Sequence, residues 1–239
     1  MGSGRDEWNE ALTALTLGEI KIEGRIPWSS NATFLVALKH EGSTLPGIYK
    51  PARGERPLRD FPMGLWRREV AAYQLDRHLG WGLVPPTAAR LDAPLGAGSI
   101  QYCVPAVPAE HYFTLLDQPS HRDALKRIAA YDLVANNADR KSGHCLLDTA
   151  GHVWAIDNAL CFHSEPKLRT VLWDFAGERV DDELLGALAP LARGEAPAGL
   201  ASLLKETEIA ALCARSAALV RSGHYPEPIG RFPYPWPLV

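Results

Sequence analysis

Long apolar runs are absent from this sequence, and their absence argues against a membrane-spanning protein. A transmembrane helix needs roughly 18 to 20 consecutive apolar residues, and no segment approaches that length. Residues 1–10 are polar and hold no apolar signal-peptide core. Asp6 stands where a myristoylation motif needs Ser or Thr. We therefore expect a cytoplasmic protein with no stable membrane anchor.

Cysteine and net charge are also scarce. The four cysteines are widely spaced, form no CxxC pair, and are expected to be free thiols in a reducing compartment: Cys103, Cys145, Cys161 and Cys213. The formal net charge is only -3, which argues against a nucleic-acid partner. What remains is an ordinary globular composition of 239 residues, 46% hydrophobic and 22% charged.

The order of the expected elements indicates an α+β protein. Strands are expected near 17–23, 33–39, 45–50, 88–92, 99–104, 144–147 and 152–156, and helices near 64–79, from a cap at Ser120, at 181–192 and at 205–220. A strand-rich first part and a helix-rich remainder favour two lobes rather than a parallel sheet. We expect one domain over 1–239, with an N-lobe at about 15–104, a hinge at about 101–108, a C-lobe at about 109–225 and a Pro-rich tail at 226–239. The tail is expected to pack as an extended strap or to bind a partner as polyproline.

Two carboxylates lie in a pattern suited to phosphoryl transfer. Asp139 is followed two residues later by Lys141 and five later by His144, and Asp157 returns at the end of the next hairpin. Phosphoryl transfer needs a carboxylate to orient the attacking hydroxyl, a cation on the moving phosphate and ligands for a metal. The protein-kinase catalytic loop uses the same five-residue offset and then a metal-binding Asp on a following strand. Either segment alone would read as a solvated turn, but together they predict a kinase site with Asp139 and Lys141 in catalysis and Asp157 and His144 at the metal.

The N-terminal half supplies candidate nucleotide ligands. Lys50 ends an apolar strand, and Glu69 follows 19 residues later on the inward row of a helix. A lysine that reaches the phosphates and is held by a helix glutamate is the kinase ion pair. The loop at 23–31 contains a single glycine and is no Walker loop, although Ser29 and Ser30 could bind phosphate oxygens. A plain hairpin loop is the equal alternative there.

These segments resemble a known group of kinases. Residues 132–140 and 155–162, with Asp139-Arg140 and Ile156-Asp157-Asn158, resemble type II phosphatidylinositol 4-kinases. Residues 69–80, closing in 84–87, are similar to their N-lobe helix and the strand after it. HipA-type kinases and small bacterial phosphatidylinositol 3-/4-kinase-like proteins share these elements, and the resemblance spans about 20–175.

The resemblance implies a two-lobed protein-kinase-like fold with a small helical C-lobe, using ATP with Mg²⁺ or Mn²⁺. It implies Lys50 and Glu69 as the nucleotide pair, Asp139 as catalytic base and Asp157 as metal ligand. It also places the adenine beside a hinge formed by Gln101, Tyr102, Cys103 and Val104. The acceptor would be a protein Ser/Thr or a small molecule, with a lipid less favoured because no membrane-binding segment accompanies the motifs.

One departure from the pattern concerns the metal. His144 stands where these kinases keep a metal-binding Asn, and imidazole suits Mn²⁺ or Zn²⁺ better than Mg²⁺. We therefore expect an unusual metal preference. Two alternatives remain: a nucleotide-binding pseudokinase that acts as a regulatory module, and a metal or redox protein that uses His144-Cys145 and Cys161-x-His163.

Overall fold

The computed structural model describes residues 3–27, 29, 31–228 and 232–239, with the side chains of 3–7 left aside. The chain forms two compact units. The first contains the residues up to Tyr73 together with Val84–Val104, and the second contains Gln74–Leu83 with Pro105–Val239. The first unit therefore starts earlier than the expected N-lobe and leaves out ten residues that we had placed in it.

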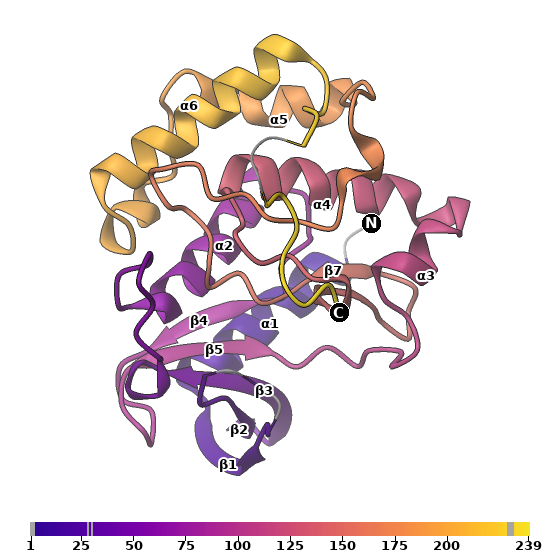
Figure 1. Cartoon of the computed structure of the whole chain (residues 1–239). Helices are drawn as coiled ribbons and strands as arrows, with labels where there is room; N and C mark the ends of the chain where they lie inside the picture. Colours follow the sequence, from indigo (N-terminus) through magenta and orange to yellow (C-terminus); the bar gives the residue numbers. More distant parts are fainter. Residues whose placement is uncertain (1–2, 28, 30, 229–231) are drawn as a thin grey trace. The chain divides into compact units, whose positions relative to one another are not determined.

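The first unit is built on a five-stranded antiparallel sheet in the order β1-β2-β3-β5-β4 (Figure 1). Its strands are β1 (Glu19–Arg25), β2 (Phe34–His40), β3 (Ser43–Pro51), β4 (Thr87–Arg90) and β5 (Gly98–Tyr102). A tight turn at Glu41 and Gly42, both with positive φ, joins β2 to β3. The predicted hairpin and the two later strands are confirmed to within a few residues.

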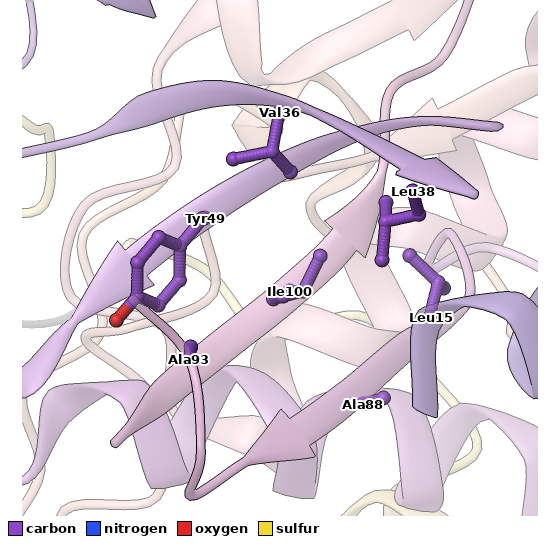
Figure 2. Packing of buried hydrophobic residues seen from close by; sticks show 7 residues of the cluster. All are labelled: Leu15, Val36, Leu38, Tyr49, Ala88, Ala93 and Ile100. Carbon is purple, nitrogen blue, oxygen red and sulfur yellow. The ribbon is translucent and has the colours of Figure 1, made fainter. Parts of the chain in front are cut away.

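A helix that the sequence analysis did not predict, α1 (Ser3–Leu17), contacts strands β2 to β5 of this sheet. Figure 2 shows the core that it helps to bury, where Leu15 of the helix lies against apolar side chains of the sheet. The cluster consists of Leu15, Val36, Leu38, Tyr49, Ala88, Ala93 and Ile100. Burial of such side chains stabilises a fold by roughly 1.5 to 3 kcal/mol each, so this cluster anchors the strands that carry Lys50 and the segment 101–104.

Helix α2 (Leu65–Leu79) confirms the predicted helix at 64–79, and Gly80 ends it with a φ of 69°. The residues of this helix up to Tyr73 belong to the first unit, and the rest belong to the second. Asp76, near its end, accepts the Leu83 amide with both carboxylate oxygens, at 3.0 and 2.9 Å. This bond fixes the turn that follows the helix.

The second unit is mainly helical. Its helices are α3 (Tyr112–Leu116), α4 (Arg122–Ala135), α5 (Asp182–Ala192) and α6 (Glu206–Ser222), and its two-stranded sheet pairs β6 (Cys145–Leu147) with β7 (Val153–Ala155). Five short 3-10 turns complete the described secondary structure of the chain: Ala52–Gly54, Pro119–His121, Ser142–His144, Trp173–Phe175 and Ala198–Ser202. The prediction that Ser120 caps α4 is wrong. Ser120 lies inside the Pro119–His121 turn, and His121 takes the capping position.

The α+β class is confirmed by this separation of an antiparallel sheet from a helical remainder. Within the described residues, no helix has both the length and the apolar composition needed to cross a membrane.

Candidate active site

In the first unit, Lys50 and Glu69 form the ion pair that the sequence predicted. The Lys50 ammonium donates to Glu69 Oε1, and Glu69 is only 1% exposed. Lys50 lies on β3 opposite Ser99 of β5, where the strands approach so closely that a Cβ at Gly98 would lie 2.4 Å from the Lys50 carbonyl oxygen. Glycine is therefore required beside the lysine. A buried carboxylate holds the ammonium in one place, which is the arrangement needed to present it to a phosphate group.

The other candidate nucleotide residues have mixed placements. Ser29 Oγ lies 2.8 Å from Thr33 Oγ1, so its hydroxyl is used within its own loop. Ser30 lies outside the described residues. Gln101 points into the sheet, where its side-chain amide donates to Thr87 Oγ1 at 2.9 Å.

The hinge residues end the first unit. The amides of Tyr102 and Cys103 donate to the carbonyls of Pro86 and Pro46, and Val104 is the unit's last residue. The role of 101–104 in binding adenine stays a prediction.

In the second unit, the loop that carries Asp139 leaves α4 at a left-handed residue. Asn136 ends the helix with a φ of 57°, as the poor helix propensity of Asn136-Asn137 indicated. The Asn137 side chain then accepts the Asp139 amide at 2.9 Å. The loop is thus held by side-chain bonds from its first residues on.

Asp139 and Lys141 lie side by side, with the Lys141 ammonium donating to Asp139 Oδ2. Burial raises the pKa of the Asp139 carboxyl, and the repulsion of Asp157 adds to this, while Lys141 opposes it. A carboxyl with a raised pKa is a better proton acceptor, which suits the predicted base. About a quarter of its side chain (27%) remains exposed.

His144 and Asp157 are also brought together. His144 Nε2 lies 3.4 Å from Asp157 Oδ2, and the other ring nitrogen lies 3.0 Å from the Asp139 carbonyl oxygen. Asp157 follows β7 and has a φ of 56°, a conformation uncommon outside glycine that often marks a functional position. The ring of His144 therefore connects the metal-ligand candidate to the loop of the candidate base.

A buried network that we did not assign a role supports both loops. Arg140 is fully buried and binds Asp132 of α4 through Nε and Nη2, at 3.0 and 2.9 Å. It also donates to the Ile156 carbonyl and, at 2.7 Å, to Asn158 Oδ1. Burial alone would lower the pKa of Arg140, but Asp132 outweighs it and the pKa is raised. The sequence held one signal for this pair: the carboxylate of Asp132 falls within the apolar stripe of α4. A buried charge needs a partner of opposite charge.

The residue types at His144 and Asp157 fit a divalent cation. Metal–nitrogen and metal–oxygen bonds of about 2.1 Å would place two neighbouring ligand atoms about 3 to 3.5 Å apart, and the observed separation is 3.4 Å. No group of three His, Cys, Asp or Glu side chains suited to a metal occurs among the described residues. A nucleotide-bound Mg²⁺ at this place would commonly take its remaining ligands from phosphate oxygens and water.

The cysteines do not support the redox alternative. Cys145 and Cys161 are fully buried, and burial raises the pKa of the Cys145 thiol to about 12. A thiol so resistant to ionisation is a poor nucleophile, which argues against a redox role for Cys145.

Comparison with known proteins gives one close relative. No known family model matches the sequence. The chain is 39% identical to protein Rv2133c of Mycobacterium tuberculosis (strain ATCC 25618 / H37Rv) over an alignment 259 positions long, which covers 92% of this chain and 92% of that protein. The chain belongs to the Rv2133c family.

Among solved structures, this member of the Rv2133c family is similar to the Helicobacter pylori proinflammatory kinase CtkA. The TM-score is 0.51 at 12% sequence identity, and the match covers 88% of this chain and 94% of that one. At this identity the likeness concerns the fold, and it confirms the prediction of a two-lobed, kinase-like α+β fold. The closer resemblance to type II phosphatidylinositol 4-kinases stays a prediction.

Proposed function

We propose that this protein is an ATP-dependent kinase that transfers the γ-phosphate to a hydroxyl of a protein Ser/Thr or a small molecule, with a lipid the less favoured acceptor. The observation that carries the proposal is the arrangement in the second unit. There the Asp139–Lys141 pair and the His144–Asp157 pair are linked by the bond between the His144 ring and the Asp139 carbonyl. The kinase-like fold supports phosphoryl transfer at these residues, but a fold does not identify the acceptor.

In the proposed reaction, Asp139 orients the acceptor hydroxyl and takes its proton, a role that its raised pKa supports. The Lys141 ammonium, held beside it, offsets negative charge on the transferred group. Asp157 and His144 would hold a divalent cation, and Lys50, fixed by Glu69, would bind the nucleotide phosphates. Bound ATP with its metal supplies the phosphoryl group.

The test is metal-dependent ATP turnover by the purified chain. ADP formation and label transfer, to the chain itself and to casein, are measured in Mg²⁺ and in Mn²⁺. The Asp157→Ala variant is expected to lose at least about 100-fold in turnover, the scale expected for removing a charged group that acts on the transition state. Asp182→Ala is the matched control, because Asp182 pairs with Arg179 at the surface and its side chain is 80% exposed.

Three outcomes are informative. Turnover that survives in Asp157→Ala would contradict the assignment of the metal ligand. Absence of turnover with nucleotide binding retained, measured by calorimetry, would favour the pseudokinase. Absence of both would remove the proposal.

A further inference from the structure

Residues 232–239, the last described segment of the Pro-rich tail, lie against the loops of the candidate active site. We call these residues the strap. The Ser142 amide donates to the Leu238 carbonyl at 2.9 Å, and the Pro233 carbonyl accepts from the Thr170 amide at 3.1 Å and from Trp173 Nε1 at 2.9 Å. In Figure 1 the strap is the yellow segment that ends at the C label. These contacts confirm that residues 232–239 pack as a strap, while binding of a partner as polyproline stays a prediction.

The bond to Ser142 caps the turn that carries His144. Ser142 is the first residue of the Ser142–His144 turn and is fully buried. The first amides of a helical turn have no partner within it, and a buried amide without a partner is costly. The Leu238 carbonyl supplies that partner. The strap thereby fixes the start of the turn whose last residue lies 3.4 Å from Asp157.

The bonds to Pro233 hold Thr170 and Trp173, in a second segment that pairs with the 139–144 loop at Arg140. Thr170 pairs with Arg140 in a parallel bridge, and the amide of Val171 donates to the Arg140 carbonyl at 3.1 Å. The Thr170 hydroxyl also donates to Asp132 at 3.2 Å. The strap is therefore bonded to both segments that flank the buried Arg140.

The three hydrogen bonds of the strap described above use its backbone carbonyls, and the strap leaves the candidate carboxylates open. Its Pro235 is buried, while the side chains of Phe232 and Trp236 are 77% and 88% exposed. With the strap in place, 27% of the Asp139 side chain and 44% of that of Asp157 remain exposed. These values favour support of the loop over obstruction of it.

We infer that the strap is a positioning element that holds the 139–144 loop in its active geometry. The inference rests on the proposed function for its effect on turnover, but its structural part does not. Because the Lys50–Glu69 pair belongs to the other unit, the strap should affect the metal-dependent chemical step and not the binding of metal-free ATP.

The experiment compares the full chain with a variant that lacks residues 232–239. Hydrogen exchange of the Ser142 amide is measured by NMR, kcat is measured in the better metal, and the Kd for ATP is measured by calorimetry without metal. Loss of the Leu238 bond is expected to accelerate Ser142 exchange at least about tenfold. We expect kcat to fall by roughly the same factor while the Kd for metal-free ATP stays unchanged. Phe232→Ala is the matched control, since its exposed ring makes none of the three bonds and both readouts should stay at the wild-type values.

Trp173→Phe gives a second test if the shortened chain does not fold. It removes one donor to Pro233 and should accelerate exchange of the Thr170 amide and lower kcat. Unchanged exchange at Ser142 in the shortened chain, or at Thr170 in Trp173→Phe, would overturn the inference. Faster turnover in the shortened chain would overturn it as well, because the strap would then inhibit. If the full chain shows no turnover, the proposed function fails while the exchange measurement still decides whether the strap holds the loop.

Discussion

At the scale of single residues, His144 is the side chain that most affects the expected chemistry. It places an imidazole nitrogen 3.4 Å from a carboxylate oxygen of Asp157. An amide oxygen in its place would be a harder ligand and would suit Mg²⁺. The ring also bonds the Asp139 carbonyl, so its replacement tests ligand type and loop geometry together.

We predict that His144→Asn shifts the ratio of Mn²⁺- to Mg²⁺-supported turnover toward Mg²⁺ by about tenfold. This is the lower end of the effects expected when a metal's surroundings are changed. Turnover is measured against metal concentration, and Mn²⁺ binding is followed independently by electron paramagnetic resonance. His152→Asn is the control, because His152 bonds the Gly82 carbonyl on the other side of the hairpin. An unaltered metal profile in His144→Asn would contradict a role for His144 as a ligand.

The sequence predicted some residue contacts and missed others for a physical reason. The Lys50–Glu69 pair was predicted because Lys50 ends an apolar strand and Glu69 lies on the inward row of a helix, as in the kinase ion pair. The bonds from Arg140 to Ile156 and Asn158 depend on where the chain returns after a hairpin, and no local pattern encodes that return. Asp132 lies within an apolar stripe, which indicates that a buried partner must offset its charge. The sequence does not show that this partner is Arg140.

At the scale of elements, the β6–β7 hairpin positions Asp157, and Asp148 closes its turn. Asp148 is 8% exposed and accepts the amides of Ala150 and His152 and the indole of Trp154, at 2.9, 2.8 and 2.8 Å. Burial alone would raise the pKa of Asp148, but these hydrogen bonds outweigh it and lower the pKa below its ordinary value of 3.8. The ionised carboxylate is thus the form that the hairpin needs.

We predict that Asp148→Asn destabilises the protein by about 1 to 3 kcal/mol at pH 7, because an amide nitrogen would face the Trp154 donor. Since the folded pKa is depressed, the stabilisation by Asp148 is fully present above pH 3.8 and is lost as the pH falls through the folded pKa. Urea unfolding of both proteins between pH 7 and pH 3 measures this. The difference between them should shrink in acid, and a difference that is independent of pH would contradict the role of the charge.

Helix α1 shows how far element prediction reached. Trp8, Ala11, Leu12 and Leu15 have the spacing of an amphipathic helix, so a signal was present in the sequence. The polar residues between them give a low mean hydropathy, and packing of Leu15 into the sheet core stabilises the helix. Strands were easier to place, because turn residues around Gly42 and at 94–98 bound them in the sequence.

At the scale of the whole molecule, nucleotide binding should increase the free energy of unfolding. A ligand that binds only the folded state at 100 times its Kd stabilises it by about 2.7 kcal/mol. For a chain of this size, each kcal/mol raises Tm by roughly 2 to 4 °C. We therefore predict that saturating ATP with Mn²⁺ raises Tm by about 5 to 10 °C.

The Lys50→Gln/Glu69→Gln variant should lose most of this shift. The double change avoids leaving Glu69, which is 1% exposed, as an unpaired buried charge. Lys21→Gln/Glu23→Gln is the control, since it removes a Lys–Glu pair of the same sheet whose side chains are 67% and 40% exposed. Differential scanning calorimetry with and without ATP gives the shift for each. Equal shifts in both variants would mean that Lys50 does not bind the nucleotide. A full loss in the Lys50 variant alone would assign nucleotide binding to the Lys50–Glu69 pair, because both substituted pairs belong to the first unit and differ in burial.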